Sequence, residues 1–386
     1  MIYFNNASTT LMKPDIVYDA FVNASKTLSN MGRGSSALSI QTSRAVFDAR
    51  EKVASFFGVE NPLRIGFTKN ATESLNTGIC GLLGAGDHAI ATVADHNSVL
   101  RPLFRLEKEV GLEVTLIQCA GNGDIDPDEF KKAIKPNTKL IVVTHVSNVT
   151  GTVFDIEAIG AIAREHGVLF FVDAAQSAGV LNIDVQKAGI DLLAFTAHKN
   201  LFCPQGLGGL YVRDGVKIRP LMLGGGAANS LELHPDLDMP EAAEAGTINM
   251  PGIISLGCAV DFICENRADI QQKESELTGY FLQRIPEIPY LRLLGRNRNA
   301  GRLALFSLAG GEYPLQDIAA FMEEKYGIVV RTGLQCAPLI HPYIGSAEEG
   351  TLRISLSYFN QKEEIDTFMK ALGEFPGCGS SGASPL

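Results

Sequence analysis

The sequence predicts an α/β protein with a large ligand-binding domain and a smaller α+β domain. Between residues 64 and 212, apolar runs of strand length alternate with segments of helical periodicity. That alternation is typical of a mixed, mostly parallel sheet covered by helices on both faces. From about residue 251 the pattern changes to long helices and shorter strands. A chain of 386 residues is also long for one core, so two domains are expected.

The first half of the chain supplies the elements of the large sheet. Residues 3–10 are expected to be extended, and a helix follows Lys13-Pro14-Asp15 because proline is tolerated in a first helical turn. A second helix is predicted over about 36–57. The alternation then runs through a strand at 64–68, a helix at 72–83, a strand at 88–93, a helix after 96, a strand at 112–117, a helix at 126–134, a strand at 139–145, a helix at 155–167, and strands at 168–174, 191–197 and 208–212.

The second half predicts the smaller domain. Two long helices are expected at about 251–272 and 273–286, followed by strands RLALFSL (302–308) and TLRISLS (351–357). Further helices are predicted at 314–327 and 361–373. Residues 376–386 are rich in Gly and Ser, a composition that predicts a mobile tail.

Composition excludes several classes of protein. A net charge of −10 argues against a nucleic-acid partner, since phosphate binding needs a basic surface. The start MIYFNNAST lacks the features of a signal peptide, and no apolar run approaches the roughly 20 residues that cross a bilayer. A cytoplasmic protein without a membrane partner is therefore expected. The seven cysteines show no CxxC and no His/Cys ligand spacing, so no metal site or disulfide framework is predicted.

Two stretches, FVDAAQSAG (171–179) and AFTAHKN (194–200), place Asp173 at the carboxyl end of one predicted strand and Lys199 just after the next. Ligands of open α/β sheets bind at the carboxyl ends of the strands. An acid and a lysine there suit pyridoxal phosphate, whose aldehyde bonds to a lysine amine and whose ring nitrogen a carboxylate keeps protonated. Alternatively, Asp173 is a helix cap and Lys199 a solvated cation. The glycine-rich stretch 78–86 precedes a strand instead of following one, so a dinucleotide fingerprint is discounted.

The motifs around these residues resemble the class V aminotransferase family of fold type I pyridoxal phosphate enzymes, and within it the cysteine desulfurase and selenocysteine lyase branch. The resemblance runs in order from about residue 3 to about residue 370. Its motifs are ASTT (7–10), NATES (70–74), DHNS (95–98), THVSNVTGT (144–152), VDAAQS (172–177), TAHKNLFCPQGLGGLYV (196–212), EAGTIN (244–249) and RTGLQCAP (331–338).

The resemblance implies the domain organisation and the cofactor site. Residues 13–250 would form the large pyridoxal phosphate domain around a seven-stranded type of sheet, and 1–12 with 251–375 the small domain. His96 would stack on the cofactor ring and relay protons. Thr247 would complete the phosphate site of a neighbouring subunit, which implies a homodimer. The implied cofactor-binding residues are Ala71, Thr72, His96, Asn148, Asp173, Gln176, Thr196, His198, Lys199 and Thr247.

The same resemblance implies the reaction. Lys199, His96 and Cys336 would be catalytic, with Cys336 receiving sulfur from L-cysteine as a persulfide while L-alanine is formed. Ala7, Asn148, Arg331 and Arg353 would bind the substrate. A guanidinium suits the substrate carboxylate because it donates two parallel hydrogen bonds. A sulfur-acceptor protein is the implied partner.

Other functions stay open at this point. L-Selenocysteine is an alternative substrate, and another class V C–S lyase, a transaminase or a catalytically idle scaffold are alternative functions. Many relatives carry a histidine directly before the cysteine, whereas this chain has Gln335 there. The segment 30–36 also lacks the histidines that many relatives place there. Cys203 is either a second thiol near the site or a packed small residue, and Cys378 is either a sulfur relay or an uninvolved thiol of the tail.

Overall fold

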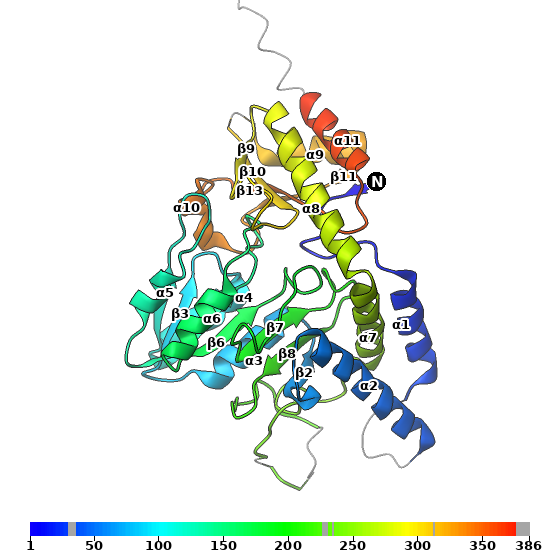
Figure 1. The fold of residues 1–386 in the computed structure, drawn as a ribbon, viewed down its shortest axis with the longest axis vertical. Helices are drawn as coiled ribbons and strands as arrows, with labels where there is room; N and C mark the ends of the chain where they lie inside the picture. Colours follow the sequence, from blue (N-terminus) through cyan, green and yellow to red (C-terminus); the bar gives the residue numbers. More distant parts are fainter. Residues whose placement is uncertain (30–35, 226–230, 234, 312, 376–386) are drawn as a thin grey trace, which may run out of the picture.

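A seven-stranded sheet forms the centre of the larger part of the molecule (Figure 1). The computed structural model describes residues 1–29, 36–225, 231–233, 235–311 and 313–375. The strand order is β2-β8-β7-β6-β5-β3-β4. Strands β3 to β7 run parallel, and β8 runs antiparallel to both of its neighbours. The predicted mixed, mostly parallel sheet is therefore confirmed.

The strands of this sheet are β2 (Ile65–Thr68), β3 (His88–Thr92), β4 (Glu113–Ile117), β5 (Thr138–Thr144), β6 (Leu169–Asp173), β7 (Leu192–Thr196) and β8 (Gly208–Val212). The helices that precede or connect them are α1 (Asp15–Thr27), α2 (Ala37–Phe56), α3 (Ala71–Leu82), α4 (Asn97–Val110), α5 (Asp128–Ala133) and α6 (Ile156–Glu165).

Alternate residues of the strands face two apolar cores. On β6, Phe171 packs with α3 and α4 in one core, while Phe170 and Val172 pack with α2, α5 and α6 in the other. All five residues of β7 and all five of β8 are buried. Strands buried on both faces read as nearly continuous apolar runs, which is why their positions were predictable from the sequence.

A four-stranded antiparallel sheet, ordered β12-β13-β10-β9, organises the smaller part at the top of Figure 1. Its core includes Phe4, Phe281, Phe306 and Phe368. The N-terminal strand β1 (Ile2–Tyr3) joins this part by pairing in parallel with β11 (Ile328–Val329). The remaining elements are α8 (Arg267–Arg284), β9 (Arg292–Leu294), β10 (Leu305–Ala309), α9 (Leu315–Tyr326), β12 (Arg331–Gly333), α10 (His341–Ile344), β13 (Thr351–Ser355) and α11 (Lys362–Gly373).

The break between the two long helices lies earlier than the sequence predicted. Helix α7 spans Met250–Glu265 and α8 begins at Arg267, whereas the predicted break was near 272. Asn266 lies between the two helices, and its side-chain amide and its backbone N–H both donate to the carbonyl of Phe262. The sequence at this point, ENRAD (265–269), is polar, a local signal that the prediction did not use.

Helix α7 packs with the larger part of the molecule. Its residues Ile253, Leu256 and Val260 belong to the core that covers one face of the large sheet. Helix α8 then carries the chain toward the small sheet (Figure 1), where its Phe281 joins the second core. We therefore propose that the division between the domains falls between α7 and α8 instead of at residue 251; the predicted grouping of residues 1–12 with the later segment stays a proposal.

Within the described residues, the helices are too short or too polar to traverse a lipid bilayer. A cytoplasmic location stays a prediction. The predicted mobile tail 376–386, its Cys378, and residues 30–35 of the histidine-free segment lie outside the described residues.

A buried ion pair fixes the segment that precedes Thr247. Arg50 on α2 donates to both carboxylate oxygens of Glu244, at 2.7 and 3.0 Å, and also to the carbonyl of Ile65. The backbone N–H of Phe67 donates to the same carboxylate at 2.7 Å. The Arg50 and Glu244 side chains are only 5% and 8% exposed.

We expect Glu244→Ala to lower the free energy of unfolding by about 3–5 kcal/mol, because it leaves the Arg50 guanidinium buried without its partner. Urea unfolding followed by circular dichroism measures the change. The neighbouring pair of Lys52 and Asp261 also joins α2 to a later segment but is 43% and 45% exposed. Asp261→Ala should therefore cost less than about 1 kcal/mol. Equal losses in the two variants would contradict this ranking.

Candidate active site

The carboxyl ends of three adjacent strands meet in one cavity. Thr144 ends β5, Asp173 ends β6 and Thr196 ends β7, and Thr144 is paired with Asp173 in the sheet register. The cavity has a volume of about 160 Å³. It is lined by Asn70, Ala71, Thr72, Leu75, His96, Ser98, Thr144, Asn148, Asp173, Ala175, Gln176, Thr196, His198 and Lys199. The structure thus brings together nine of the ten residues predicted to bind a cofactor.

Lys199 and Asp173 are the charged pair of the cavity. Burial lowers the pKa of Lys199 to about 8, although the Asp173 carboxylate opposes that shift. The cations of Arg353 and Arg331 lower the lysine pKa further. Burial also raises the pKa of Asp173. The backbone N–H of Ala175, which donates to the Asp173 carboxylate at 2.9 Å, opposes this shift. The low lysine pKa means that a neutral, nucleophilic amine is accessible near neutral pH.

The first turn of α3 opens toward the cavity. Asn70 caps this helix by accepting from the N–H of Glu73 at 3.0 Å. Ala71 and Thr72 follow in the first turn, where backbone N–H groups have no partner within the helix. Thr72 Oγ1 lies 2.7 Å from Ser98 Oγ, which belongs to the first turn of α4. Two helix N-termini therefore adjoin here, an arrangement that favours an anion.

His96 is held as a neutral imidazole. Its Nδ1 accepts from the backbone N–H of Ser98 at 3.0 Å, so the neutral ring carries its proton on Nε2. Burial lowers its pKa to about 4, and the nearby charge of Lys199 contributes. A neutral imidazole can stack on an aromatic ring without placing a further cation beside Lys199.

Two buried polar atoms close in sequence to Lys199 have no hydrogen-bond partner among the described residues. They are Thr196 Oγ1 and His198 Nδ1. Leaving such groups unpaired costs free energy, and both residues line the cavity. A bound group with acceptor oxygens would satisfy them.

Asn148 and Gln176 also line the cavity and are both buried. The Gln176 side-chain amide donates to the carbonyl of Ala7 at 3.1 Å. Asn148 donates to the carbonyl of Gln335, and its own carbonyl accepts from Arg353 at 3.0 Å. Ala7, a predicted substrate-binding residue, thus supports the site through its backbone.

Arg331 and Arg353 lie beside each other because β12 and β13 pair them directly. Each guanidinium donates to Ser8 Oγ, at 3.0 Å from Arg331 and 2.9 Å from Arg353. Arg331 also donates to Cys336 Sγ at 3.2 Å. Burial and the neighbouring Arg331 lower the pKa of Arg353 to about 9. Two adjacent guanidinium groups with one hydroxyl between them form a site that a carboxylate would neutralise.

Thr247 is the predicted cofactor residue that the structure does not bring to this cavity; its side chain is exposed. Cys203 is fully buried, lies 3.1 Å from Ser255 Oγ, and burial raises its pKa to about 12. Both observations favour the packed small residue over the second reactive thiol. The prediction missed Asn70 and Ser98, although both stand in the quoted motifs; the contact of Ser98 with Thr72 spans 26 residues and left no sequence signal.

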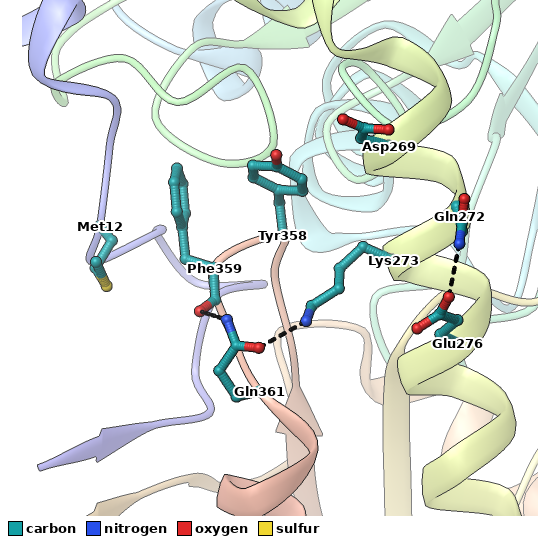
Figure 2. A pocket seen from close by; sticks show the side chains of 8 residues that line it. All are labelled: Met12, Asp269, Gln272, Lys273, Glu276, Tyr358, Phe359 and Gln361. Atoms are coloured by element: carbon teal, nitrogen blue, oxygen red, sulfur yellow. Dashed lines mark hydrogen bonds between the residues drawn. The ribbon is translucent and has the colours of Figure 1, made fainter.

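A second, more open groove lies between α8, the N-terminal segment and the loop after β13 (Figure 2). Tyr358 and Phe359 form its aromatic wall, and Lys273 donates to Gln361 across it at 2.8 Å. None of the predicted site residues lines it. In the part of the chain that the structure describes, no group of three or more His, Cys, Asp or Glu side chains is arranged to hold a metal ion.

The profile of the family described as aminotransferase class-V matches residues 2–368, nearly the whole chain. The chain belongs to the aminotransferase class-V family. This confirms the family predicted from the motifs. The match includes the strand ends that line the cavity, the segment around Lys199 and the segment that carries Cys336.

Relatives within the aminotransferase class-V family point to one branch. The chain is 34% identical to a probable cysteine desulfurase from Methanothermobacter thermautotrophicus, over 98% of this chain and 95% of the relative. The structure of an apo cysteine desulfurase from Thermococcus onnurineus is similar with a TM-score of 0.91 at 33% identity, covering 97% and 94% of the two chains. The cysteine desulfurase CsdA of Escherichia coli, in an S-sulfonic acid form, gives 0.84 at 27% identity over 96% and 93%.

The lowered pKa of Lys199 predicts that this amine reacts with small aldehydes at a lower pH than an exposed lysine does. In protein free of bound ligand, reductive methylation of Lys199 by formaldehyde should rise with pH around a midpoint of about 8. The sign follows because only the neutral amine reacts, and a pKa of about 8 leaves about one amine in ten neutral at pH 7.

Mass spectrometry of the labelled peptides measures this profile. Lys217 serves as the internal control, because it is exposed and its hydrogen bond to Asp236 raises its pKa. Lys217 should need a higher pH than Lys199 to reach the same extent of methylation. Coincident profiles for the two lysines would contradict the argument.

Proposed function

We propose that this chain is a pyridoxal phosphate-dependent cysteine desulfurase that converts L-cysteine to L-alanine and keeps the sulfur as a persulfide on Cys336. The observation that carries the proposal is the placement of the Cys336 thiol against Arg331, beside a cavity that holds Lys199 and Asp173. The cysteine desulfurases among the relatives support the same reaction.

The cavity residues fit pyridoxal phosphate. Its phosphate would meet the first turns of α3 and α4 and the unpaired Thr196 Oγ1 and His198 Nδ1. Its ring nitrogen would meet the Asp173 carboxylate, and its aldehyde the Lys199 amine. Asn148 and Gln176 would donate to its phenolic oxygen, and the neutral ring of His96 would cover one of its faces. When bound, this cofactor supplies an aldehyde that bonds amines and a ring that accepts electrons from the substrate Cα.

The two arginines would bind the substrate carboxylate. The Nε of Arg353 is buried without a partner in the described part of the chain, and burial disfavours the charge of this guanidinium. A bound carboxylate would compensate both deficits through charge-assisted hydrogen bonds. Ser8 Oγ, which both arginines now contact, would help to orient the same carboxylate.

Proton handling would fall to Lys199. Its lowered pKa allows the amine to accept the Cα proton of the substrate near neutral pH and to return a proton later. Asp173, which is buried in the cavity lining, would balance the positive charge of the ring nitrogen. His96 would keep water from that face of the cavity.

Cys336 would perform the sulfur transfer. Its thiolate, beside Arg331, attacks the sulfur of L-cysteine; the new S–S bond forms as the bond between that sulfur and its Cβ breaks. The carbon fragment retains the bonding electrons, gains a proton and leaves as L-alanine. The sum is L-cysteine plus thiol giving L-alanine plus persulfide, with no external oxidant. A sulfur-acceptor protein would then take up the persulfide sulfur.

Cys336→Ala should abolish alanine formation from L-cysteine while the protein keeps the yellow colour of its bound cofactor, because the thiol does not contribute to the cavity lining. Alanine assays and visible spectra measure the two properties. Undiminished alanine formation would overturn the role of Cys336. Assays of the same variant with L-selenocysteine separate the selenocysteine lyase alternative, since selenide that is released without Cys336 would favour that function.

A homodimer would complete the phosphate site. Thr247 is exposed and does not line the cavity of its own chain. Helix α2 also exposes apolar side chains, including Ile40 at 47% and Phe47 at 40%. These observations support a second copy that covers α2 and brings its Thr247 to this cavity.

Mixing of two defective variants tests the shared site. Lys199→Ala and Thr247→Ala should each bind pyridoxal phosphate weakly, because each lacks a contact to it. A mixed dimer would contain one site with both defects and one intact site, so mixing after gentle dissociation should restore activity in part. Absence of any recovery, with mixed dimers verified by mass spectrometry, would place Thr247 in the cavity of its own chain or outside both.

A further inference from the structure

The loop that carries Cys336 has an unusual backbone. Gln335 has a φ of 52° and Cys336 a φ of 61°. Among the described residues other than glycine, Phe202 alone shares a positive φ. Side chains disfavour this left-handed region, so two such residues in succession persist only where their surroundings hold them.

The side chain of Gln335 provides much of that hold. It is only 1% exposed, and its amide nitrogen lies 3.2 Å from the carbonyl oxygens of Arg331 and Gly333 and 3.4 Å from that of Thr351. A fourth acceptor, Thr351 Oγ1, also lies at 3.4 Å. These acceptors belong to β12 and β13, the strands that carry the two arginines. The amide thus ties the loop to the small sheet.

The large part of the molecule holds the same two residues through their carbonyl groups. Asn148 donates its side-chain amide to the carbonyl of Gln335, and the N–H of Asn97 donates to the carbonyl of Cys336 at 2.8 Å. Asn148 also lines the cofactor cavity. Its amide nitrogen has a second hydrogen that can serve a group bound there. One side chain therefore connects the cavity to the cysteine loop.

We propose that Gln335 is a positioning residue for sulfur transfer: its amide holds the loop in the left-handed conformation that keeps the Cys336 thiol against Arg331. The residue takes no part in the chemistry, since its amide does not ionise. Instead it fixes the distance and direction from which the thiolate meets the substrate sulfur. The inference rests on the proposed function for the reaction that it serves, but the anchoring itself is measurable without turnover.

The alternative is that position 335 merely needs a residue that tolerates a positive φ. Gln335→Gly removes the backbone constraint together with the anchor, whereas Gln335→Met keeps the length of the side chain and removes its amide, whose oxygen has no hydrogen-bond partner among the described residues. Under the proposal both variants release the loop. If backbone conformation alone mattered, Gln335→Gly would behave like the wild type. Gln118→Met is the matched control, because Gln118 is exposed on the loop after β4.

Hydrogen exchange measured by mass spectrometry on the wild type and the three variants tests the anchor. Peptides that cover residues 333–338 and the amide of Asn97 should exchange at least about tenfold faster in Gln335→Met and Gln335→Gly, because the loop opens more often. The control should match the wild type. Unchanged exchange in the 335 variants would overturn the proposal.

Single-turnover assays on the protein loaded with pyridoxal phosphate test the consequence. Persulfide formation on Cys336 should slow by about tenfold or more, since misplacing a reacting group by about 1 Å is that costly. The KM for L-cysteine should change by less than about twofold, because Arg353 and the cavity are intact. Faster exchange with undiminished turnover would also overturn the proposal. A wild type that forms no persulfide would instead refute the proposed function, and the exchange result would stand alone.

Discussion

The register of the parallel strands is the constraint on which the rest of the structure depends. Hydrogen bonding between β5, β6 and β7 places the ends of the three strands at one edge of the sheet, with Asp173 in the middle. A shift of one residue would turn Asp173 to the opposite face. Phe170 and Phe171 oppose such a shift, because each fills a different core. The apolar packing of the strands therefore sets where the charged groups of the site lie.

Around that edge the protein accumulates positive charge that it does not neutralise internally. Arg353 and Arg331 lower the pKa of Lys199, and Arg331 also lowers the pKa of Arg353. The Asp173 carboxylate opposes the shift of Lys199. Burial of these cations costs free energy. Anionic ligands, such as the phosphate and the carboxylate of the proposed function, would recover that cost. The weak internal pairing would thus serve the proposed binding function.

Local patterns predicted the parts of this arrangement that a single segment encodes. Apolar runs gave the strands, and the residues after them gave Asp173 and Lys199, because strand ends determine where such side chains emerge. Contacts between distant segments were not predictable in this way. Ser8 joins the two arginines only after β12 and β13 have paired. The proposed role of Thr247 needs a second copy of the chain, so local patterns did not locate its contacts.

The contacts of the N-terminal segment have a consequence for biosynthesis. Asn6 donates to the carbonyl of Ser355 and Ser8 accepts from Arg353, across 349 and 345 positions of the chain respectively. This segment is translated long before β13, so these contacts must wait until β13 has left the ribosome. Contacts between residues so far apart in the sequence form slowly. The large sheet can form during translation of the strands that follow it, whereas the contacts of Ser8 with Arg331 and Arg353 can form only once β12 and β13 are in place.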